Sequence, residues 1–440
     1  MATIKFPQYD LYKDTDSKWL GKIPKHWEVK PLKHLGELYA GLNGKSGADF
    51  SKEYVEGFSP FVPFVSIANF ERVPREYQFV RVNSNESQNL IKQGDILFLM
   101  SSETFEDIAK AAVYDQEDED VFLNSFCKGF RPNSNHLNSG FANYLLMANC
   151  YRHYFSSSAR GFTRINLKQE YINNTPAVLP PVSEQLAIAK FLDNKCSNID
   201  EAIRIEESQI ALLRERKQII IQEAVTRGLN HAVQTKESGI DWVGQIPMNW
   251  ESIPNKYLFK LKKETVGKRS GQYDLLSLTL RGVIKRDMDN PEGKFPTDFD
   301  TYQEVSPGDF IFCHFDVEET PRTVGLSDYF GMITGAYTVY SVTPGVDPRF
   351  LLHFYIFADT DKKMRSMYTG LRNTISKDAF GAFKTPLPPI EEQRAIVAHI
   401  DDASRKIEDS IEIKERQIVA LNEYRASLID AAVTGKIKIT

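Results

Sequence analysis

Two long segments of the chain place apolar or small side chains at alternating intervals of three and four residues. In the first segment these positions are Ala189, Leu192, Cys196, Ile199, Ile203, Ile210, Leu213, Ile220 and Ala224. In the second they are Val397, Ile400, Ser404, Ile407, Ile411, Ile418, Leu421, Leu428 and Ala432. A seam kept over about five heptads is typical of a coiled-coil helix. Because both segments share the pattern, we expect the helices to pair with each other, the alternative being that each packs separately on its own domain.

Each predicted helix follows a leucine and two prolines, in Leu179-Pro180-Pro181-Val182-Ser183-Glu184-Gln185 and in Leu387-Pro388-Pro389-Ile390-Glu391-Glu392-Gln393. Proline is tolerated only in the first turn of a helix, so both helices are expected to begin at these motifs. Ser183 is the expected N-cap, and the acidic residues that follow suit the positive end of the helix dipole. The first helix is predicted over residues 183–227.

Two other blocks of sequence also occur twice, in the same order. Trp19-Leu20-Gly21-Lys22-Ile23-Pro24-Lys25-His26-Trp27-Glu28 matches Trp242-Val243-Gly244-Gln245-Ile246-Pro247-Met248-Asn249-Trp250-Glu251, and Gly94-Asp95-Ile96-Leu97-Phe98 matches Gly308-Asp309-Phe310-Ile311-Phe312. Ordered repeats of this kind indicate a duplicated pair of domain and helix. We therefore predict a first domain over 1–182, a central helix over 183–227, a second domain over 228–386, and a C-terminal helix and tail over 387–440.

The globular halves are predicted to mix strands and helices. The runs 61–67 and 274–280 look like strands, the two Gly-Asp pairs look like turns that lead into strands, and helices are expected over 140–154 and 348–357. The fold class is therefore α+β, with two similar mixed domains, two long coiled-coil helices and a pseudo-twofold internal repeat. The repeated tryptophan blocks are mostly apolar, and we expect them in the core or against the helix pair, with a partner-binding surface as the alternative.

Charge is distributed unevenly along the chain. The net charge is −5, but the two helical segments 183–226 and 391–434 together carry −6, which leaves +1 for the rest. A near-neutral remainder permits local basic patches of the kind that contact phosphates. No apolar run approaches the roughly 20 residues needed to span a bilayer. Four cysteines without CxxC spacing argue against a disulfide framework or a zinc site and fit a reducing cytoplasm.

Motifs that carry chemistry are missing from the sequence. There is no NPPY-like methyltransferase motif with a glycine-rich cofactor loop, and Gly44-Lys45-Ser46 has Tyr39 where a P-loop needs glycine. Glu292-Gly293-Lys294 resembles a nuclease pattern but lies in a turn sequence. The histidines form no HxxxH pair. We therefore expect no catalytic residue, no metal site and no cofactor in this chain.

The two LPPxxEQ motifs, each opening a long helix behind a divergent domain that contains GDIxF or GDFIF, resemble the specificity subunit of type I restriction–modification systems over essentially the whole chain. The resemblance implies that two target-recognition domains each read half of a split double-stranded DNA site, and that the two long helices pair antiparallel and set the spacing between the half-sites. It also implies two modification subunits that bind S-adenosylmethionine and methylate adenine, with restriction and translocase subunits as further partners in a prokaryotic cytoplasm. The target bases stay undetermined.

The duplication itself sorts the candidate DNA contacts. Features shared by both halves cannot distinguish two half-sites, so they suit structure or phosphate contacts, whereas base reading belongs to unshared segments. The shared candidates are Lys45 and Lys268 in glycine-rich loops, with Arg269 next to Lys268, and Arg160, Thr163, Arg164, Arg372 and Asn373 in the segments before the LPP motifs. The unshared candidates follow the Gly-Asp blocks and are Ser102, Glu103, Thr104, Lys110, His314, Asp316 and Arg322. Basic turns add Arg72, Arg75, Arg281, Lys285 and Arg286.

Two other functions stay open at this point. One is an enzyme, a standalone methyltransferase or nuclease with diverged motifs, and the other is a coiled-coil scaffold that binds only protein. Each candidate side chain above also has a plain alternative as a solvated surface residue or part of a polar turn.

Overall fold

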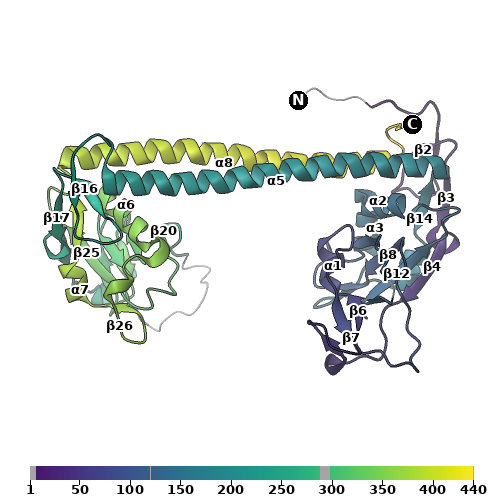
Figure 1. The fold of residues 1–440 in the computed structure, drawn as a ribbon, viewed down its shortest axis with the longest axis horizontal. Helices are drawn as coiled ribbons and strands as arrows, with labels where there is room; N and C mark the ends of the chain where they lie inside the picture. Colours follow the sequence, from purple (N-terminus) through teal and green to yellow (C-terminus); the bar gives the residue numbers. More distant parts are fainter. Residues whose placement is uncertain (1–5, 119, 288–297, 440) are drawn as a thin grey trace. The chain divides into compact units, whose positions relative to one another are not determined.

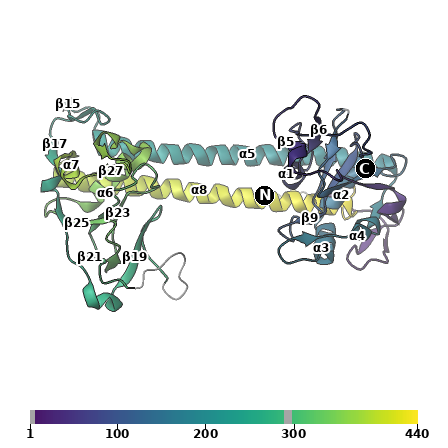
Figure 2. The same cartoon turned by 90° about the horizontal axis from the view of Figure 1, so that it is seen from below.

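The computed structural model describes residues 6–118, 120–287 and 298–439. These form two compact units, one made of the chain up to Glu206 together with the segment from Arg416 onward, the other of Glu207–Glu415. Figures 1 and 2 label the elements of both units. The sequence block Glu292-Gly293-Lys294 lies outside the described residues.

The first unit holds two four-stranded sheets and three short strand pairs. One sheet has the order β10 (Ala111–Tyr114), β8 (Asp95–Leu99), β12 (Cys127–Pro132) and β4 (Gly36–Ala40), and is antiparallel throughout. The other has the order β11 (Phe122–Leu123), β6 (Ser59–Val62), β7 (Gln78–Val80) and β5 (Phe50–Ser51), with β11 parallel to β6. The pairs are β1 (Tyr12–Asp14) with β2 (Lys22–Pro24), β3 (Glu28–Pro31) with β14 (Pro176–Leu179), and β9 (Ser101–Ser102) with β13 (Ile165–Asn166). Its short helices are α1 (Phe64–Asn69), α2 (Ser139–Met147), α3 (Asn149–Ser158) and α4 (Gln169–Asn173).

The second unit repeats this plan. We call β10-β8-β12-β4 and its counterpart in the second unit the larger sheets, and β11-β6-β7-β5 and its counterpart the smaller sheets, after their sizes in the first unit. In the second unit, the larger sheet has the order β18 (Phe259–Leu261), β25 (Thr338–Val342), β22 (Phe310–Phe312) and β23 (Val324–Leu326). The smaller sheet has the order β20 (Gly282–Lys285), β19 (Asp274–Thr279), β24 (Gly331–Ile333) and β21 (Gln303–Val305). The strand pairs are β15 (Thr235–Glu237) with β16 (Gln245–Pro247), β17 (Glu251–Pro254) with β28 (Lys384–Leu387), and β26 (Tyr368–Thr369) with β27 (Thr374–Ile375). Its short helices are α6 (Pro348–Asp359) and α7 (Lys377–Ala382).

The two halves share the larger sheet and two of the three strand pairs. They differ at one edge of the smaller sheet and in the third pair, which joins 101–102 to 165–166 in the first unit and lies within 368–375 in the second. Both larger sheets place the strand of the Gly-Asp block, β8 or β22, in the interior of an antiparallel order. In the smaller sheets, β6 and β19 each have one parallel and one antiparallel neighbour. The fourth strand then lies beside the antiparallel neighbour in the first unit, as β5, and beside the parallel neighbour in the second, as β21. The larger sheet and the tryptophan-block strands are duplicated and form a common frame, while the outer edge of the smaller sheet is not duplicated.

The long helices are α5 (Val182–Arg227) and α8 (Ile390–Val433), and each contributes a part to both units. In the second unit they run antiparallel, because Arg214 pairs with Glu415 while Lys217, further along α5, pairs with the earlier Glu408 at 2.6 Å. In the first unit, Arg425 of α8 contacts Asp200 of α5 at 3.4 Å. The predicted seam positions are buried or half-buried in both helices, which confirms the coiled-coil pattern.

Several local predictions need correction. The first long helix begins at Val182, so Ser183 lies inside its first turn and is not the N-cap. The run 61–67 is a strand only through Val62, after which Pro63 precedes helix α1. The helix expected over 140–154 breaks at Ala148, which has extended backbone and separates α2 from α3. The strand over 274–280 and the helix over 348–357 are present nearly as predicted.

A glutamate carboxylate joins each repeated tryptophan block to the start of a long helix; Glu184 is buried and Glu392 half-buried. In the first unit, the indole N–H of Trp27 donates to Glu184 at 3.2 Å, and His26 and the hydroxyl of Tyr9 also contact this carboxylate. In the second unit, the indole of Trp250 donates to Glu392 at 3.0 Å. Both indoles are fully buried. The tryptophan blocks therefore hold the helix pair, as expected for one of the two interpretations of the sequence.

The end of the other long helix reaches the same place in each unit. A Cβ added at Gly435, just after α8, would come within 3.2 Å of the Trp27 ring, and a Cβ at Gly228, just after α5, within 3.2 Å of the Trp250 ring. Both glycines have positive φ, +74° and +72°, which favours glycine at a helix C-terminus. Each tryptophan thus contacts the start of one helix and the end of the other within its own unit.

Removing the Glu392 carboxylate is expected to destabilise the second unit. Glu392→Ala leaves the buried Trp250 indole N–H without an acceptor, which costs on the order of 1–3 kcal/mol. The matched control is Glu391→Ala, since the neighbouring Glu391 is 80% exposed and pairs only with Arg394 one turn away. Urea unfolding of both variants measures the difference, and equal midpoints for the two would contradict this account of the joint.

His314 gives the second unit a dependence on pH. It is buried, its ring stacks on Phe312 with centroids 5.5 Å apart, and its Nε2 has no hydrogen-bond partner. Burial, with a smaller contribution from Lys377, lowers the His314 pKa to about 4. The unfolded chain therefore binds a proton at this side chain between about pH 6.5 and 4 while the folded chain does not, so the folded state loses stability as the pH falls through that window.

The variant His314→Phe keeps the ring stack and removes the titration. Between pH 7 and pH 5 the wild-type chain is expected to lose about 2 kcal/mol more unfolding free energy than the variant. Denaturant unfolding at the two pH values measures this, with His399→Phe on the exposed face of α8 as control. An equal loss in wild type and His314→Phe would show that His314 does not carry the effect.

Candidate nucleic-acid interface

In each unit, the segment after the Gly-Asp strand lies against the loop that precedes the LPP motif. We call these paired segments the hairpin edges: residues 101–110 with 160–166 in the first unit, and 313–322 with 368–375 in the second. The contact is equivalent in both, because the amide of Leu167 donates to the carbonyl of Met100 at 3.1 Å and the amide of Ile375 donates to the carbonyl of His314 at 2.8 Å. The fold therefore brings predicted unshared and shared candidates together twice.

The first hairpin edge is built on the β9–β13 ladder, in which Ser102 pairs with Ile165. Ser102 is buried, and its hydroxyl accepts the amide of Thr104, whose own hydroxyl donates to Asp107 at 2.8 Å. Lys110 pairs with the same Asp107 and donates to the carbonyl of Ala68. Glu103 is exposed. The segment is thus held by its own side chains, and Ser102 is turned into the fold.

Arginines fix the loop of the first hairpin edge. The Arg160 guanidinium donates to the carbonyls of Ser157 and Ala159 at the end of α3, which satisfies groups that a helix terminus leaves free. Arg164 is exposed and lies over the ring of Phe126 at 4.8 Å, a cation–π contact that orients its charge. Thr163 is exposed beside it.

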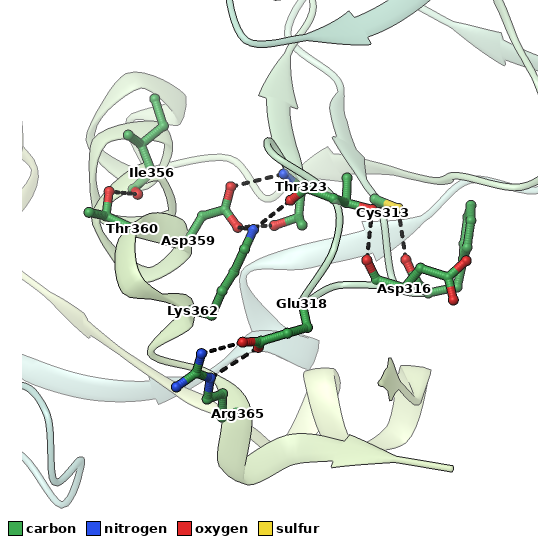
Figure 3. A network of polar contacts seen from close by, with 11 residues as sticks. Cys313, Asp316, Glu318, Thr323, Ile356, Asp359, Thr360, Lys362 and Arg365 are labelled. Atoms are coloured by element: carbon green, nitrogen blue, oxygen red, sulfur yellow. Dashed lines mark hydrogen bonds and ion pairs between the residues drawn. The ribbon is translucent and has the colours of Figure 1, made fainter. Parts of the chain in front are cut away.

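The second hairpin edge is held by a polar network, part of which Figure 3 shows. The buried Asp359 accepts from the amide and hydroxyl of Thr323 at 2.9 and 2.6 Å, and from Lys362 at 2.7 Å. Lys362 also donates to the carbonyl of Thr320 at 2.6 Å. Arg365 donates to Glu318 at 3.0 Å. These contacts tie the later part of the 313–322 segment, and Thr323 after it, to the last residue of α6 and to the residues that follow this helix.

The hairpin of the second edge is clamped to the same segment. Arg372 forms a two-pronged ion pair with Asp316, whose amide in turn donates to the carbonyl of Arg372 at 2.7 Å. Arg372 lies over the ring of Phe315 at 5.2 Å, and Asn373 donates to Glu319 at 3.2 Å. The guanidinium lowers the pKa of the Asp316 carboxyl below its usual value. Each hairpin edge therefore carries an exposed arginine stacked on a phenylalanine.

The predicted DNA contacts in the glycine-rich loops have different surroundings in the two units. The Lys45 side chain is 4% exposed and pairs with Glu86, whereas its counterpart Lys268 is exposed. Arg269, next to Lys268, reaches Glu304 at 3.8 Å. The equivalence of the two lysines in sequence thus does not extend to their surroundings, and Lys45 is drawn into the structure by a carboxylate that the repeat does not share.

The basic turns also meet acidic or backbone partners. Arg72 pairs with Asp115 and Asp193, and Arg75 with Asp118. In the second unit, Lys285 pairs with Asp274 and Arg322 donates to the carbonyl of Leu280. Arg281 is exposed in the β19–β20 turn. The backbone N–H of Arg286, which follows β20, donates to the carbonyl of Leu275 at 2.8 Å. Arg322 and Arg281 therefore belong to one corner of the second unit, beside its hairpin edge.

Sequence reasoning missed the phenylalanines under the arginines and the carboxylate of Asp359 behind the second edge. Phe126 and Phe315 lie in segments that the repeat does not align, so no sequence signal singled them out. A further repeat, at the ends of the two long helices, could have been found in the sequence. Ala224-Val225-Thr226 matches Ala432-Val433-Thr434, and each block is followed shortly by a glycine, Gly228 or Gly435.

Among the described residues, no group of three or more histidines, cysteines, aspartates and glutamates is placed to hold a metal ion. The four cysteines, Cys127, Cys150, Cys196 and Cys313, are free thiols. None of the helices in the described part of the chain is long and apolar enough to cross a membrane.

Comparison with known proteins gives one consistent result. Residues 24–214 match the family described as "Type I restriction modification DNA specificity domain". The Methanocaldococcus jannaschii protein assigned as the MjaX type I restriction enzyme specificity subunit is 25% identical over 461 residues, covering 99% of both chains.

Two solved structures share the fold. The HsdS subunit from Thermoanaerobacter tengcongensis aligns with a TM-score of 0.53 at 14% identity, covering 94% of this chain and 98% of that one. A chain from a study of complex assembly and conformational transition of the type I R-M system aligns with a TM-score of 0.64 at 13% identity, covering 93% and 98%.

These matches agree with the duplicated frame, with the LPPxxEQ motifs at the starts of both long helices, and with the absence of catalytic motifs from the sequence. The alternatives of a diverged methyltransferase or nuclease and of a protein-only scaffold are therefore set aside. The chain belongs to the family of type I restriction–modification specificity subunits, which are the non-catalytic, DNA-recognising components of those enzymes.

Proposed function

We propose that each unit reads one half of a split double-stranded DNA site through its hairpin edge. The observation that carries this proposal is the repeated contact between a segment shared by both halves and a segment that differs between them. A shared loop with an oriented arginine suits phosphate contacts, which set register on the duplex without reading sequence. The adjoining unshared segment then supplies side chains for base edges.

Within this proposal the candidate residues take different roles. Arg164 and Arg372 are exposed and preoriented, and we assign them to phosphates. Glu103, Thr104 and Lys110 in the first unit, and Arg322 and Arg281 in the second, are the candidates for base contacts. Lys45 and Ser102 drop out of the contact set because their side chains are buried. His314 drops out for the same reason.

The partners follow from the family. Two modification subunits that bind S-adenosylmethionine and methylate adenine assemble on the helix pair, and restriction and translocase subunits complete the enzyme in the cytoplasm of a prokaryotic cell. This chain supplies recognition and positioning. The test is to purify it with a modification subunit and measure retention of DNA from a random-sequence pool. Enrichment of one bipartite sequence supports the proposal, while retention without sequence preference contradicts it.

Arg164 and Arg372 are expected to contribute affinity for DNA that does not depend on its sequence. In the assembled complex, Arg164→Ala and Arg372→Ala should each weaken binding about ten-fold on all sequences and reduce the slope of log affinity against log salt by about one. Arg394→Ala is the control, because Arg394 is an exposed arginine of α8 that pairs with Glu391. If Arg164→Ala and Arg372→Ala both bind DNA like wild type at several salt concentrations, the assignment of these arginines to phosphates fails.

The spacing between half-sites is expected to follow helix length. Inserting one heptad after Gln209 in α5 and another after Lys414 in α8, two residues that hydrogen-bond to each other, keeps the seam in register and lengthens both helices by about 10 Å. The preferred spacer should then grow by about three base pairs, at about 3.4 Å per base pair. Selection from DNA pools of varied spacer length measures the preference. An unchanged spacer would show that the helices do not set it.

A further inference from the structure

Each hairpin edge carries at its tip an apolar side chain that is fully exposed. Phe162 follows Gly161 and is 103% exposed, and Leu371 follows Gly370 and is 104% exposed. The next most exposed large apolar side chain among the described residues, Tyr54, is 70% exposed. Single exposed apolar residues are ordinary on protein surfaces, but these two differ from the others in degree and occupy the same place in both halves.

The tips are not loose ends on which exposure is accidental. In the first unit, the backbones of Arg160 and Asn166 exchange two hydrogen bonds of 3.1 and 2.9 Å beneath the tip. In the second, Thr369 and Thr374 pair in the β26–β27 ladder, and the hydroxyl of Thr369 donates to the carbonyl of Thr374 at 3.0 Å. A braced hairpin holds its tip residue out into solvent. Turn positions normally carry glycine, asparagine, aspartate or serine, so a phenylalanine and a leucine there call for a binding role.

The surrounding charge points to the kind of partner. The segments 160–166 and 368–375 contain three arginines and no acidic residue. Beside each apolar tip lies the arginine that is stacked on a phenylalanine, Arg164 or Arg372, and Arg372 is also paired with Asp316. An apolar side chain flanked by arginine matches proteins that insert a wedge between base pairs while cations hold the neighbouring phosphates. This chemistry favours duplex DNA as the occupant over an apolar protein groove.

We propose that Phe162 and Leu371 are apolar wedges, each inserted between adjacent base pairs of one half-site, where they partly unstack the step. The proposal rests on the function proposed above and adds a mode of reading. A wedge makes no base-specific hydrogen bond, so it is compatible with a feature that both halves share. It would make binding depend on how easily a step unstacks, which adds sequence preference at a position that no polar side chain touches.

The experiment uses the complex of this chain with its modification subunits and duplexes that carry the selected site. The fluorescent base 2-aminopurine is placed at successive steps of each half-site, away from the methylated adenine. Wild type is expected to raise the fluorescence at one step in each half-site. Phe162→Ala should abolish the rise in one half-site only and Leu371→Ala in the other, each with a loss of affinity of about ten-fold, in the range found for aromatic–base contacts.

Controls separate the wedge from folding and from protein docking. Phe162→Leu and Leu371→Phe keep an apolar tip and should retain the fluorescence rise, and Leu11→Ala, which truncates a leucine that is 62% exposed elsewhere in the first unit, should change nothing. Size-exclusion chromatography without DNA reports assembly. Normal assembly of a tip variant, together with loss of the increase in 2-aminopurine fluorescence, supports the wedge.

Two results would overturn the inference. Tip variants that fail to assemble with the modification subunits would assign the tips to a protein surface, and variants that assemble and give the wild-type fluorescence pattern would show that no wedge exists. Both differ from failure of the proposed function itself, in which wild type selects no bipartite site.

Discussion

The hydrogen bond between a buried indole and a helix-opening carboxylate fixes the rest of this structure. A carboxylate taken out of water is costly unless donors surround it, and Glu184 is 7% exposed with Trp27, His26 and Tyr9 around it. These donors come from a block more than 150 positions earlier in the chain. The contact therefore couples the direction of a long helix to the orientation of a globular half, and it does so twice.

The same joint explains why the LPPxxEQ motifs are the most readable feature of the sequence. The prolines set where the helix starts, and the glutamate accepts the indole. The glutamine has a structural role as well, since the side-chain Oε1 atoms of Gln185 and Gln393 accept from the backbone N–H groups of Asn138 and Asp347, the N-caps of α2 and α6, both at 2.8 Å. The glutamate and the glutamine of the motif therefore meet equivalent polar partners in both copies. Residue spacing predicted the coiled-coil period and the strand of each Gly-Asp block, and the family resemblance implied the antiparallel pairing.

What the sequence could not supply depends on long-range partners or on backbone geometry. Lys45 and Lys268 occupy equivalent positions, yet only Lys45 meets a carboxylate, because Glu86 comes from a segment with no counterpart in the second half. The burial of Ser102 and His314 likewise depends on how the unshared segments fold. The turn at Ala148 and the early start of α5 at Val182 were missed because local propensity does not fix element ends. The apolar tips escaped notice because exposure of a phenylalanine or leucine is invisible in a sequence pattern.

The division between frame and edge also extends to how such a protein diversifies. The fourth strand of the smaller sheet changes sides between the halves, as β5 or as β21, without disturbing the larger sheet or the tryptophan joint. The segments 101–110 and 313–322 are each held mainly by contacts within their own unit, such as Thr104 with Asp107 or Lys362 with Asp359. A change of sequence in these segments therefore costs local stability only. Under the proposed function, recognition can be altered one half-site at a time, because the contacts that hold the helices lie in different residues from those proposed to face the duplex.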